Sequence, residues 1–350
     1  MKPKLPVREA ILKRQTYEAP AEGRWGKIRL DFNENTTGCS PAVLRALRTL
    51  SAKGLAMYPE YEAPTKVLAR YFRVKPAELL LTNGGDDALR VFFDTFVEPH
   101  SHILICEPTF PMYRYYAEIA GARIQVLRYS KKMEFPLAEV LQALRKKPRV
   151  FFLANPNNPT GTLVAKSSIA KILKAASHTA VVLDEAYSDF SGLTCVPWIR
   201  RFHNLFIAKT FSKAAGLAGL RLGAVIARQD SLAMVRRAMP PFPVNTSALA
   251  AAVAAVRERR TIERYIRHTK HLRAWFAQQL ERRGVRVFPS ACNFLLANFG
   301  SRGPALFRTF TRHGILVRER GKDLGPGFAR ITIGTQAELQ SLLKILDRTP

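Results

Sequence analysis

Two side chains that could carry covalent or acid–base chemistry follow apolar runs of this sequence. Asp184 comes directly after the run at 180–183, and Lys213 lies three residues beyond the run at 205–210. A carboxylate at the mouth of a buried strand is costly without a cationic partner, and a desolvated lysine can form a Schiff base with a carbonyl compound. Lys209 offers a second amine four residues before Lys213. The residue types alone therefore leave the reacting lysine open.

Two further turns have the composition of an anion-binding site. The segment 83–87 carries two glycines between an apolar run and a helical pattern, so the backbone amides of Gly85 and Asp86 would lie at a helix N-terminus. The loop at 155–161 is rich in turn formers, and amide groups such as that of Asn158 can donate to a ligand oxygen. Ser212 and Arg221 flank the glycine turn that follows Lys213. These segments predict a phosphate site close to the reacting groups.

The elements that must position these residues alternate between short apolar runs and helix-like stretches, which predicts a mostly parallel sheet covered on both faces. Ligands of such sheets gather beyond the carboxyl ends of the strands. The expected strands are 78–82, 102–106, 123–127, 149–154, 180–183, 205–210 and 222–226, and the expected crossover helices are 87–97, 112–120, 137–145 and 167–176.

A second, smaller α+β domain is expected after the proline-rich segment 239–243. Its predicted elements are a long helical region to 283, strands at 285–288, 294–298, 315–317 and 329–333, and a last helix at 336–346. We therefore expect an N-terminal arm with part of the small domain at 1–35, a large domain at 36–243 and the small domain at 244–350.

The composition is that of a folded chain with an unusual charge. The 350 residues are 47% hydrophobic, without an apolar run long enough to span a membrane or to act as a secretion signal. Four widely spaced cysteines favour reduced thiols in the cytoplasm, and no carboxylate or thiol completes a metal site beside the histidine pairs at 100 and 102 or at 268 and 271. The net charge of +28 favours anionic ligands, and the basic stretch 257–286 keeps nucleic-acid binding as a weaker alternative.

Taken together, the motifs resemble fold-type I enzymes that use pyridoxal phosphate, and most closely the histidinol-phosphate aminotransferase family, from about residue 30 to the C-terminus. The segments that carry the resemblance are Leu30 to Asn35, Tyr58 to Glu60, Asn83 to Asp87, Pro108 to Phe110, Asn155 to Gly161, Asp184 to Tyr187, Thr210 to Arg221 and Arg330 to Gly334. The resemblance implies a fold-type I transferase with a mostly parallel seven-stranded sheet and a smaller α+β domain.

The resemblance also implies roles in the chemistry. Lys213, rather than Lys209, would bind the cofactor covalently and then move a proton, and Asp184 would pair with the pyridinium nitrogen so that the ring acts as an electron sink. Asn158 and Tyr187 look like donors to the phenolate oxygen of the ring.

Further matches concern the phosphate and the ring face of the cofactor. Gly85 and Asp86, with Ser212, Arg221 and Thr210, resemble the phosphate-binding residues. Phe110 stands where a ring-stacking tyrosine is more usual, so the stacking face remains and a hydroxyl is lost. Tyr58 is similar to a tyrosine that reaches the phosphate from the neighbouring subunit, which implies a homodimer.

The substrates implied by the resemblance are an amino donor and a 2-oxo acid, most closely histidinol phosphate and 2-oxoglutarate. Arg330 and Arg318 are similar to the anion-binding arginines of the family, and Tyr17 is near the position of a tyrosine that closes over the substrate. An aminotransferase for aromatic amino acids and a threonine-phosphate decarboxylase share nearly all of the cofactor residues and stay as alternatives.

Overall fold

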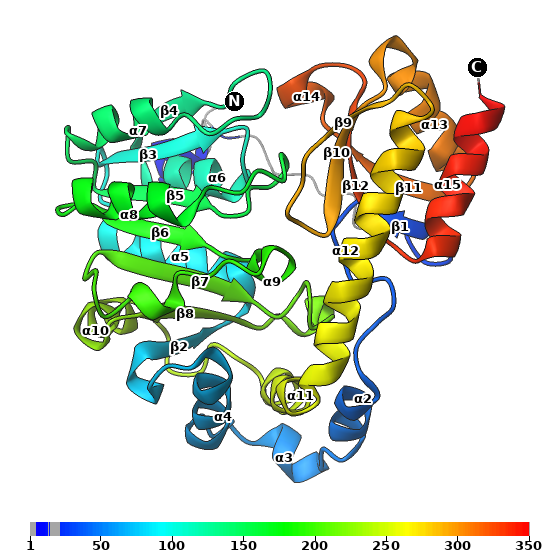
Figure 1. Cartoon of the computed structure of the whole chain (residues 1–350). Coiled ribbons are helices and arrows are strands. Elements are labelled where there is room, and N and C mark those ends of the chain that lie inside the picture. Colours follow the sequence, from blue (N-terminus) through cyan, green and yellow to red (C-terminus); the bar gives the residue numbers. More distant parts are fainter. Residues whose placement is uncertain (1–4, 13, 15–21, 350) are drawn as a thin grey trace.

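A seven-stranded sheet forms the centre of the larger part of the molecule (Figure 1). The computed structural model describes residues 5–12, 14 and 22–349. In spatial order the strands are β2 (Leu79–Thr82), β8 (Gly223–Ala227), β7 (Leu205–Thr210), β6 (Ala180–Asp184), β5 (Val150–Ala154), β3 (His102–Glu107) and β4 (Arg123–Arg128). All pairs are parallel except the two that involve β8, which runs antiparallel to β2 and to β7. The predicted mostly parallel sheet is confirmed, with strand ends shifted by at most one residue.

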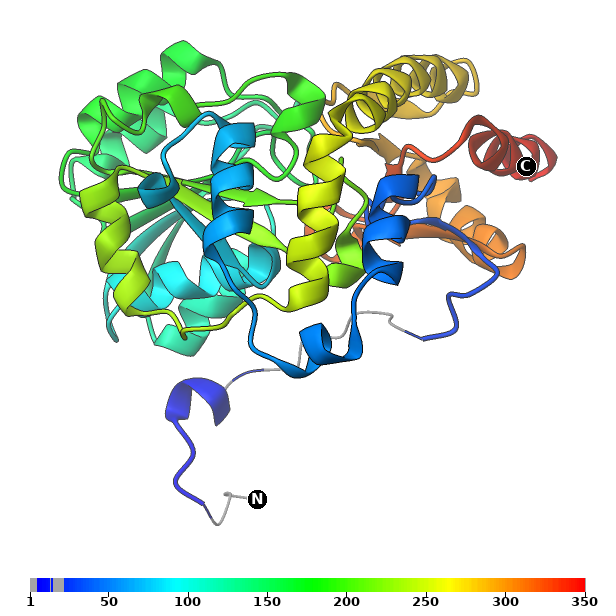
Figure 2. The same ribbon diagram turned by 90° about the horizontal axis from the view of Figure 1, so that it is seen from below.

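Helices cover both faces of this sheet (Figure 2), because the side chains of each strand alternate between two apolar cores. Phe151 belongs to one core and its neighbour Phe152 to the other, and each is almost fully buried, a contribution of about 1.5–3 kcal/mol per side chain. One face packs against α5 (Gly84–Phe96), α6 (Met112–Ala120) and α10 (Gln229–Arg237). The other packs against α2 (Pro41–Arg48), α4 (Glu62–Phe72), α7 (Leu137–Leu144), α8 (Lys166–Ala175) and α11 (Thr246–Arg257).

The smaller part of the molecule is a five-stranded sheet with helices on one side, drawn mostly in orange and red in Figure 1. Its strand order is β1 (Ile28–Leu30), β11 (Ile315–Glu319), β12 (Phe328–Thr332), β10 (Phe294–Asn298) and β9 (Arg286–Phe288). Its core includes side chains of α12 (Arg259–Glu281), α13 (Gly303–Arg312) and α15 (Gln336–Arg348). The remaining short helices are α1 (Glu9–Leu12), α3 (Ala52–Ala56), α9 (Ser188–Ser191) and α14 (Gly321–Leu324).

Two features of the fold differ from the sequence-based expectation. The long helical region expected to end at 283 is two helices, α11 and α12, which meet at Glu258. Strand β1 was not expected, since three residues are too short for a periodic signal. It pairs in parallel with β11, so the chain adds this strand to the small sheet before it crosses to the large one. The crossing segment, Phe32–Glu34, lies against the cavity described next.

Candidate active site

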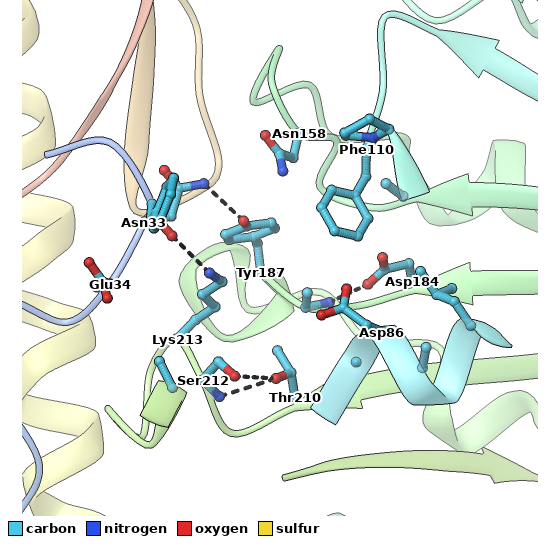
Figure 3. A pocket seen from close by; sticks show the side chains of 18 of the residues that line it. Asn33, Glu34, Asp86, Phe110, Asn158, Asp184, Tyr187, Thr210, Ser212 and Lys213 are labelled. Atoms are coloured by element: carbon cyan, nitrogen blue, oxygen red, sulfur yellow. Dashed lines mark hydrogen bonds between the residues drawn. The ribbon is translucent and has the colours of Figure 1, made fainter. Parts of the chain in front are cut away.

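A cavity of about 340 Å³ opens at the carboxyl ends of the parallel strands, on the side that faces the small sheet (Figure 3). The predicted residues that line it are Gly85, Asp86, Phe110, Asn158, Asp184, Tyr187, Thr210, Ser212, Lys213, Arg221, Arg318 and Arg330. They come from seven strands or strand-end loops of two sheets. The position of such a site follows from the fold, because parallel strands direct their carboxyl ends to one edge.

Asp184 ends β6 and projects into the cavity with a raised pKa (Figure 3). Burial is the main cause, although the Tyr113 hydroxyl donates to Oδ2 at 2.7 Å and the Ala186 amide donates to Oδ1 at 3.0 Å. Among the described residues, no lysine, arginine or histidine forms an ion pair with this carboxylate. A ligand with a protonated ring nitrogen would supply the cationic partner that the sequence argument required, so the site fits a pyridinium.

The two candidate lysines differ sharply in their surroundings. Burial, followed by the positive charge of Arg330, lowers the pKa of Lys213 to about 8, and its Nζ donates to the Phe32 carbonyl at 3.0 Å. Lys209 is also buried, but its Nζ lies 2.7 Å from a Glu185 carboxylate oxygen and donates to Ser188. Burial lowers the pKa of Lys209 less than the nearby carboxylates raise it. An amine whose pKa lies close to neutral pH is more often uncharged and is therefore the better nucleophile, which favours Lys213.

Two hydrogen-bond donors face the cavity, each oriented by a neighbour (Figure 3). The Asn33 amide donates to the Tyr187 hydroxyl at 2.9 Å, which leaves the phenol proton free to point to a ligand. The Arg330 guanidinium donates to Oδ1 of Asn158 at 2.5 Å and to the Asp31 carbonyl, which turns the Asn158 NH2 group away from Arg330. Burial raises the pKa of Tyr187, so it remains protonated.

Helix α5 begins at Gly84, three residues before the predicted start, so Gly85 and Asp86 lie in its first turn. The Arg221 guanidinium lies over this turn and donates to the Asp86 carboxylate at 2.9 Å. A side chain at Gly84 would collide with it, because a Cβ there would be 2.5 Å from an Arg221 nitrogen. The helix N-terminus and Arg221 together suit a phosphate group.

Thr210 and Ser212 line the same end of the cavity. The Thr210 hydroxyl contacts the Ser212 hydroxyl at 3.0 Å and accepts from the Ser212 amide at 3.1 Å (Figure 3). Both hydroxyls can donate to a ligand oxygen. Phe110 lies at the other side of the cavity, where its ring is edge-to-face with Tyr113 at 5.9 Å between centroids.

Guanidinium groups gather where the small sheet meets the cavity. Arg318 and Arg330 are direct partners in the antiparallel pairing of β11 with β12. Burial, together with the charges of Arg320 and Arg318, lowers the pKa of Arg330 to about 10. Arg320 also lines the cavity, a residue that the sequence argument did not name. This part of the site suits an anionic substrate group.

Two predicted residues are not among those that line the cavity. Tyr58 is 79% exposed and stacks on Phe242 with 4.5 Å between ring centroids, next to the exposed side chains of Leu55 and Met57. Tyr17 lies outside the residues that the structure describes. The single subunit therefore provides no contact between Tyr58 and its own site.

Several residues of the site were missed from the sequence. Asn33 and Phe32 stand in the segment that carried the family resemblance, and Asn33 adopts a left-handed backbone with φ of 56°, but nothing in the sequence shows that the segment crosses between sheets. The sequence predicts that Tyr113 lies in a crossover helix, about one turn after Phe110, but it does not show that the Tyr113 hydroxyl donates to Asp184. Arg320 lies one residue beyond β11 and lines the cavity with Arg318, two residues before it, a spacing that the sequence did contain.

Neither a metal centre nor a membrane segment is found in the part of the chain that the structure describes. No three histidine, cysteine or carboxylate side chains come together there as metal ligands, and no helix there has the length and apolar character needed to cross a bilayer.

Comparisons with known proteins give the site its family. Residues 26–346 match the family described as aminotransferase class I and II. A histidinol-phosphate aminotransferase of Geobacillus sp. (strain WCH70) is 35% identical over 334 residues, which cover 91% of this chain and 89% of the relative. The crystal structure of histidinol-phosphate aminotransferase from Sinorhizobium meliloti in complex with pyridoxal-5'-phosphate superposes with a TM-score of 0.89 at 24% identity, over 99% of this chain and 98% of that one.

A crystal structure of L-threonine-O-3-phosphate decarboxylase from Porphyromonas gingivalis is also similar, with a TM-score of 0.81 and 25% identity over 92% of this chain and 98% of that chain. Several activities thus share the fold, as the sequence resemblance implied. The match over most of the chain confirms both the predicted family and the predicted fold class. The chain belongs to the class I and II aminotransferases, and it is an enzyme that depends on pyridoxal phosphate.

Proposed function

We propose that this chain transfers the amino group of histidinol phosphate to 2-oxoglutarate, a step of histidine biosynthesis. The observation that carries the proposal is the pair Arg318 and Arg330, which face each other across β11 and β12 at the cavity that also holds Lys213. Paired guanidiniums bind a phosphate monoester more strongly than a single carboxylate. The 35% identity with the Geobacillus histidinol-phosphate aminotransferase supports the same reading.

The two substrates must use this pair in turn. Histidinol phosphate has no α-carboxylate and presents its phosphate ester, whereas glutamate presents carboxylates. A guanidinium can donate to either group, because a planar carboxylate and a tetrahedral phosphate both present oxygens to its paired N–H groups. Buried Arg330 would hold the group nearest to the reacting carbon, and the less buried Arg318 would add a second contact for a phosphate.

Bound pyridoxal phosphate supplies an electron sink for the carbanion formed at the substrate carbon. Asp184 would keep the ring nitrogen protonated, and Tyr187 and Asn158 would donate to the ring oxygen. Lys213 would bind the cofactor in the resting enzyme and, once released by the substrate, would move the proton at its Nζ. The pKa of about 8 suits a group that must both accept and return a proton near neutral pH.

The phosphate of the cofactor would be held by the amides of Gly85 and Asp86 with Thr210, Ser212 and Arg221. This assignment is supported by the free amides in the first turn of α5 and by the Arg221 guanidinium above them. Phe110 would stack on the cofactor ring, and its lack of a hydroxyl would tolerate aromatic donors. We therefore expect side activity on phenylalanine or tyrosine.

We also propose that the active form is a homodimer in which Tyr58 of each subunit reaches the cofactor phosphate of the other. The proposal is supported by the 79% exposure of Tyr58 and by the apolar side chains of Leu55, Met57 and Phe242 around it. We propose in addition that the chain divides into an N-terminal arm with part of the small domain at 1–35, a large domain at 36–243 and a small domain at 244–350, and that the enzyme is cytoplasmic. The four free cysteines, three of them buried, agree with a reducing compartment.

The proposed donor is tested by a half-reaction screen with the cofactor-loaded enzyme. Histidinol phosphate, phenylalanine, glutamate and threonine phosphate are added separately, and the loss of the visible absorbance of the bound cofactor is followed. We expect the largest kcat/KM with histidinol phosphate. A larger value for phenylalanine would replace the proposal by an aromatic aminotransferase.

A specific comparison keeps the decarboxylase as the second candidate, because the Porphyromonas gingivalis enzyme shares the fold over 92% of this chain. A substrate-dependent release of CO2 from threonine phosphate, without conversion of the cofactor to its amino form, would favour that activity over the transfer. The same screen therefore separates all three candidates.

A further inference from the structure

We propose that Arg320 and Asp323 form a gated third anion contact of the substrate site, which selects donors that carry a phosphate monoester over donors that carry only a carboxylate. The inference rests on the proposed function for the location of the substrate. It adds a specificity-determining residue, Arg320, and a counter-ion, Asp323, whose release accompanies the binding of a dianion.

The strand geometry directs Arg320 to the site. Residues two apart on a strand share a face, so Arg320 lies on the face of Arg318. The Arg320 amide donates to the Phe328 carbonyl at 2.8 Å, which extends the pairing of β11 with β12 by one residue beyond the strand end. Arg318, Arg320 and Arg330 consequently all line the same cavity.

The charge of Arg320 acts inside the site rather than in solvent. The Arg320 side chain is only 13% exposed, and its Nε is buried without a hydrogen-bond partner. Its effect on the ionisation of Arg330 is larger than that of Arg318, which was the predicted neighbour. Arg320 is therefore part of the electrostatic surroundings that a bound anion meets.

Only one of the three guanidiniums has a carboxylate contact within the described residues. Arg320 donates to Asp323, which lies three residues further on, whereas Arg330 is bonded to an amide oxygen and a carbonyl. The carboxylate of Asp31 behind Arg330 is already engaged by Arg24, at 2.5 and 2.7 Å. The site thus has positive charge in excess, and Asp323 offsets part of it.

Asp323 is placed to leave when a stronger anion arrives. It is 33% exposed on the short helix α14, so its carboxylate can turn into water at small cost. A phosphate dianion compensates Arg320 for the loss of Asp323, since it offers a further oxygen and a second charge. A single carboxylate is satisfied by Arg330 and leaves the Arg320–Asp323 pair closed.

The test is a double-mutant cycle on the cofactor-loaded enzyme, with kcat/KM measured for histidinol phosphate and for phenylalanine. Arg320→Met is expected to lower the value for histidinol phosphate roughly tenfold, the size of one charge-assisted contact, and to change that for phenylalanine less than about twofold. Asp323→Asn is expected to raise kcat/KM for histidinol phosphate by a few fold. In the Arg320→Met background the same substitution should have no such effect.

Lys322→Met is the matched control, because it removes an equal charge from the exposed face of the same short helix and outside the cavity. Arg320→Lys keeps the charge and a folded site if Arg320→Met proves unstable, and it should lose part of the phosphate preference only. Equal losses for both donors, or an equal effect of Lys322→Met, would overturn the gate. So would an Asp323→Asn effect that persists without Arg320.

Inorganic phosphate separates this inference from the proposed function. Its inhibition constant is measured against whichever amino donor the wild-type enzyme accepts. An inhibition constant raised by Arg320→Met and lowered by Asp323→Asn supports the gate even if histidinol phosphate proves not to be a donor. Unchanged constants in both variants refute the gate while the donor screen can still succeed.

Discussion

Lys213 and Lys209 lie on one short segment, yet their amines differ in ionisation because of their neighbours. Covalent attachment of the cofactor needs a neutral amine, so the attachment rate of the cofactor-free protein should rise as the pH passes through about 8. Arg330→Gln removes a charge that lowers this pKa, and should move the midpoint to higher pH. Borohydride trapping at timed intervals, followed by peptide mapping, measures the rate. A label on Lys209, or a wild-type midpoint near the ordinary lysine value of about 10.4, would contradict the assignment.

Tyr113 is not one of the residues that line the cavity, but it affects the ionisation of Asp184, which does line it. Its hydroxyl donates to Oδ2, a contact that lowers the pKa which burial raises. Tyr113→Phe should raise the Asp184 pKa further, and so shift the acid limb of the kcat profile to higher pH and lower kcat roughly tenfold at neutral pH. Tyr116→Phe, on the same helix and outside the cavity, is the control. An unchanged acid limb would show that Tyr113 only fills space.

Asp184 itself should be far less tolerant of change. Asp184→Asn keeps the shape of the side chain, but a neutral amide cannot hold a proton on the ring nitrogen of the cofactor. We expect the variant to bind the cofactor and to lose most of its turnover. Cofactor content by absorbance and kcat on the same sample measure both properties. A rate near that of the wild type would make Asp184 a structural residue.

At the scale of elements, the first turn of α5 and the turn at Arg221 fit together without spare room. Gly84 has a left-handed φ of 82°, and an added Cβ would press on the end of the Arg221 side chain rather than on backbone. Gly84→Ala should therefore displace the guanidinium, weaken cofactor binding roughly tenfold and lower the stability by about 1–3 kcal/mol. Titration of the cofactor and thermal unfolding measure the two effects.

The matched control is Gly219→Ala in the loop before Arg221, since an added Cβ there meets nothing within 4 Å and the φ is ordinary. It should change neither property. Equal weakening in both variants would mean that the loop as a whole, rather than the Gly84 contact, governs the affinity.

Strands and crossover helices of the large sheet were predictable because each buries an apolar run or stripe of its own. The start of α5 was placed three residues late, because two glycines look like a turn and only the folded chain shows that they begin the helix. The contacts of Asn33 and Tyr113 depend on segments brought together by tertiary structure, which periodicity does not contain. Asp184 could be named because it follows a strand, and strand ends converge in any parallel sheet, whereas Lys213 was separated from Lys209 only by the family resemblance.

At the scale of the whole molecule, the exposed Tyr58 should be an active-site residue of the partner subunit. Tyr58→Phe dimers lack the hydroxyl at both sites, and Lys213→Ala dimers lack both lysines. Mixing the two should produce hybrids with one complete site and so restore about half the activity of a wild-type dimer in each hybrid. Activity is measured after the hybrids are confirmed by mass. No restoration would mean that Tyr58 serves its own subunit or no site.

The pairing of β1 with β11 sets an order for the assembly of the protein. Ile28 lies opposite Ile315, so β1 cannot pair until the whole large sheet and the strands β9 and β10 have been synthesised. At about 5–20 residues per second, this wait is on the order of tens of seconds. The large sheet can meanwhile fold with the first turn of α5, but the Phe32 carbonyl and the Asn33 amide would be held beside Lys213 and Tyr187 only once β1 has paired with β11. The enzyme would thus take up its cofactor in two stages, with the phosphate held first and the reactive amine enclosed once β1 and β11 have paired.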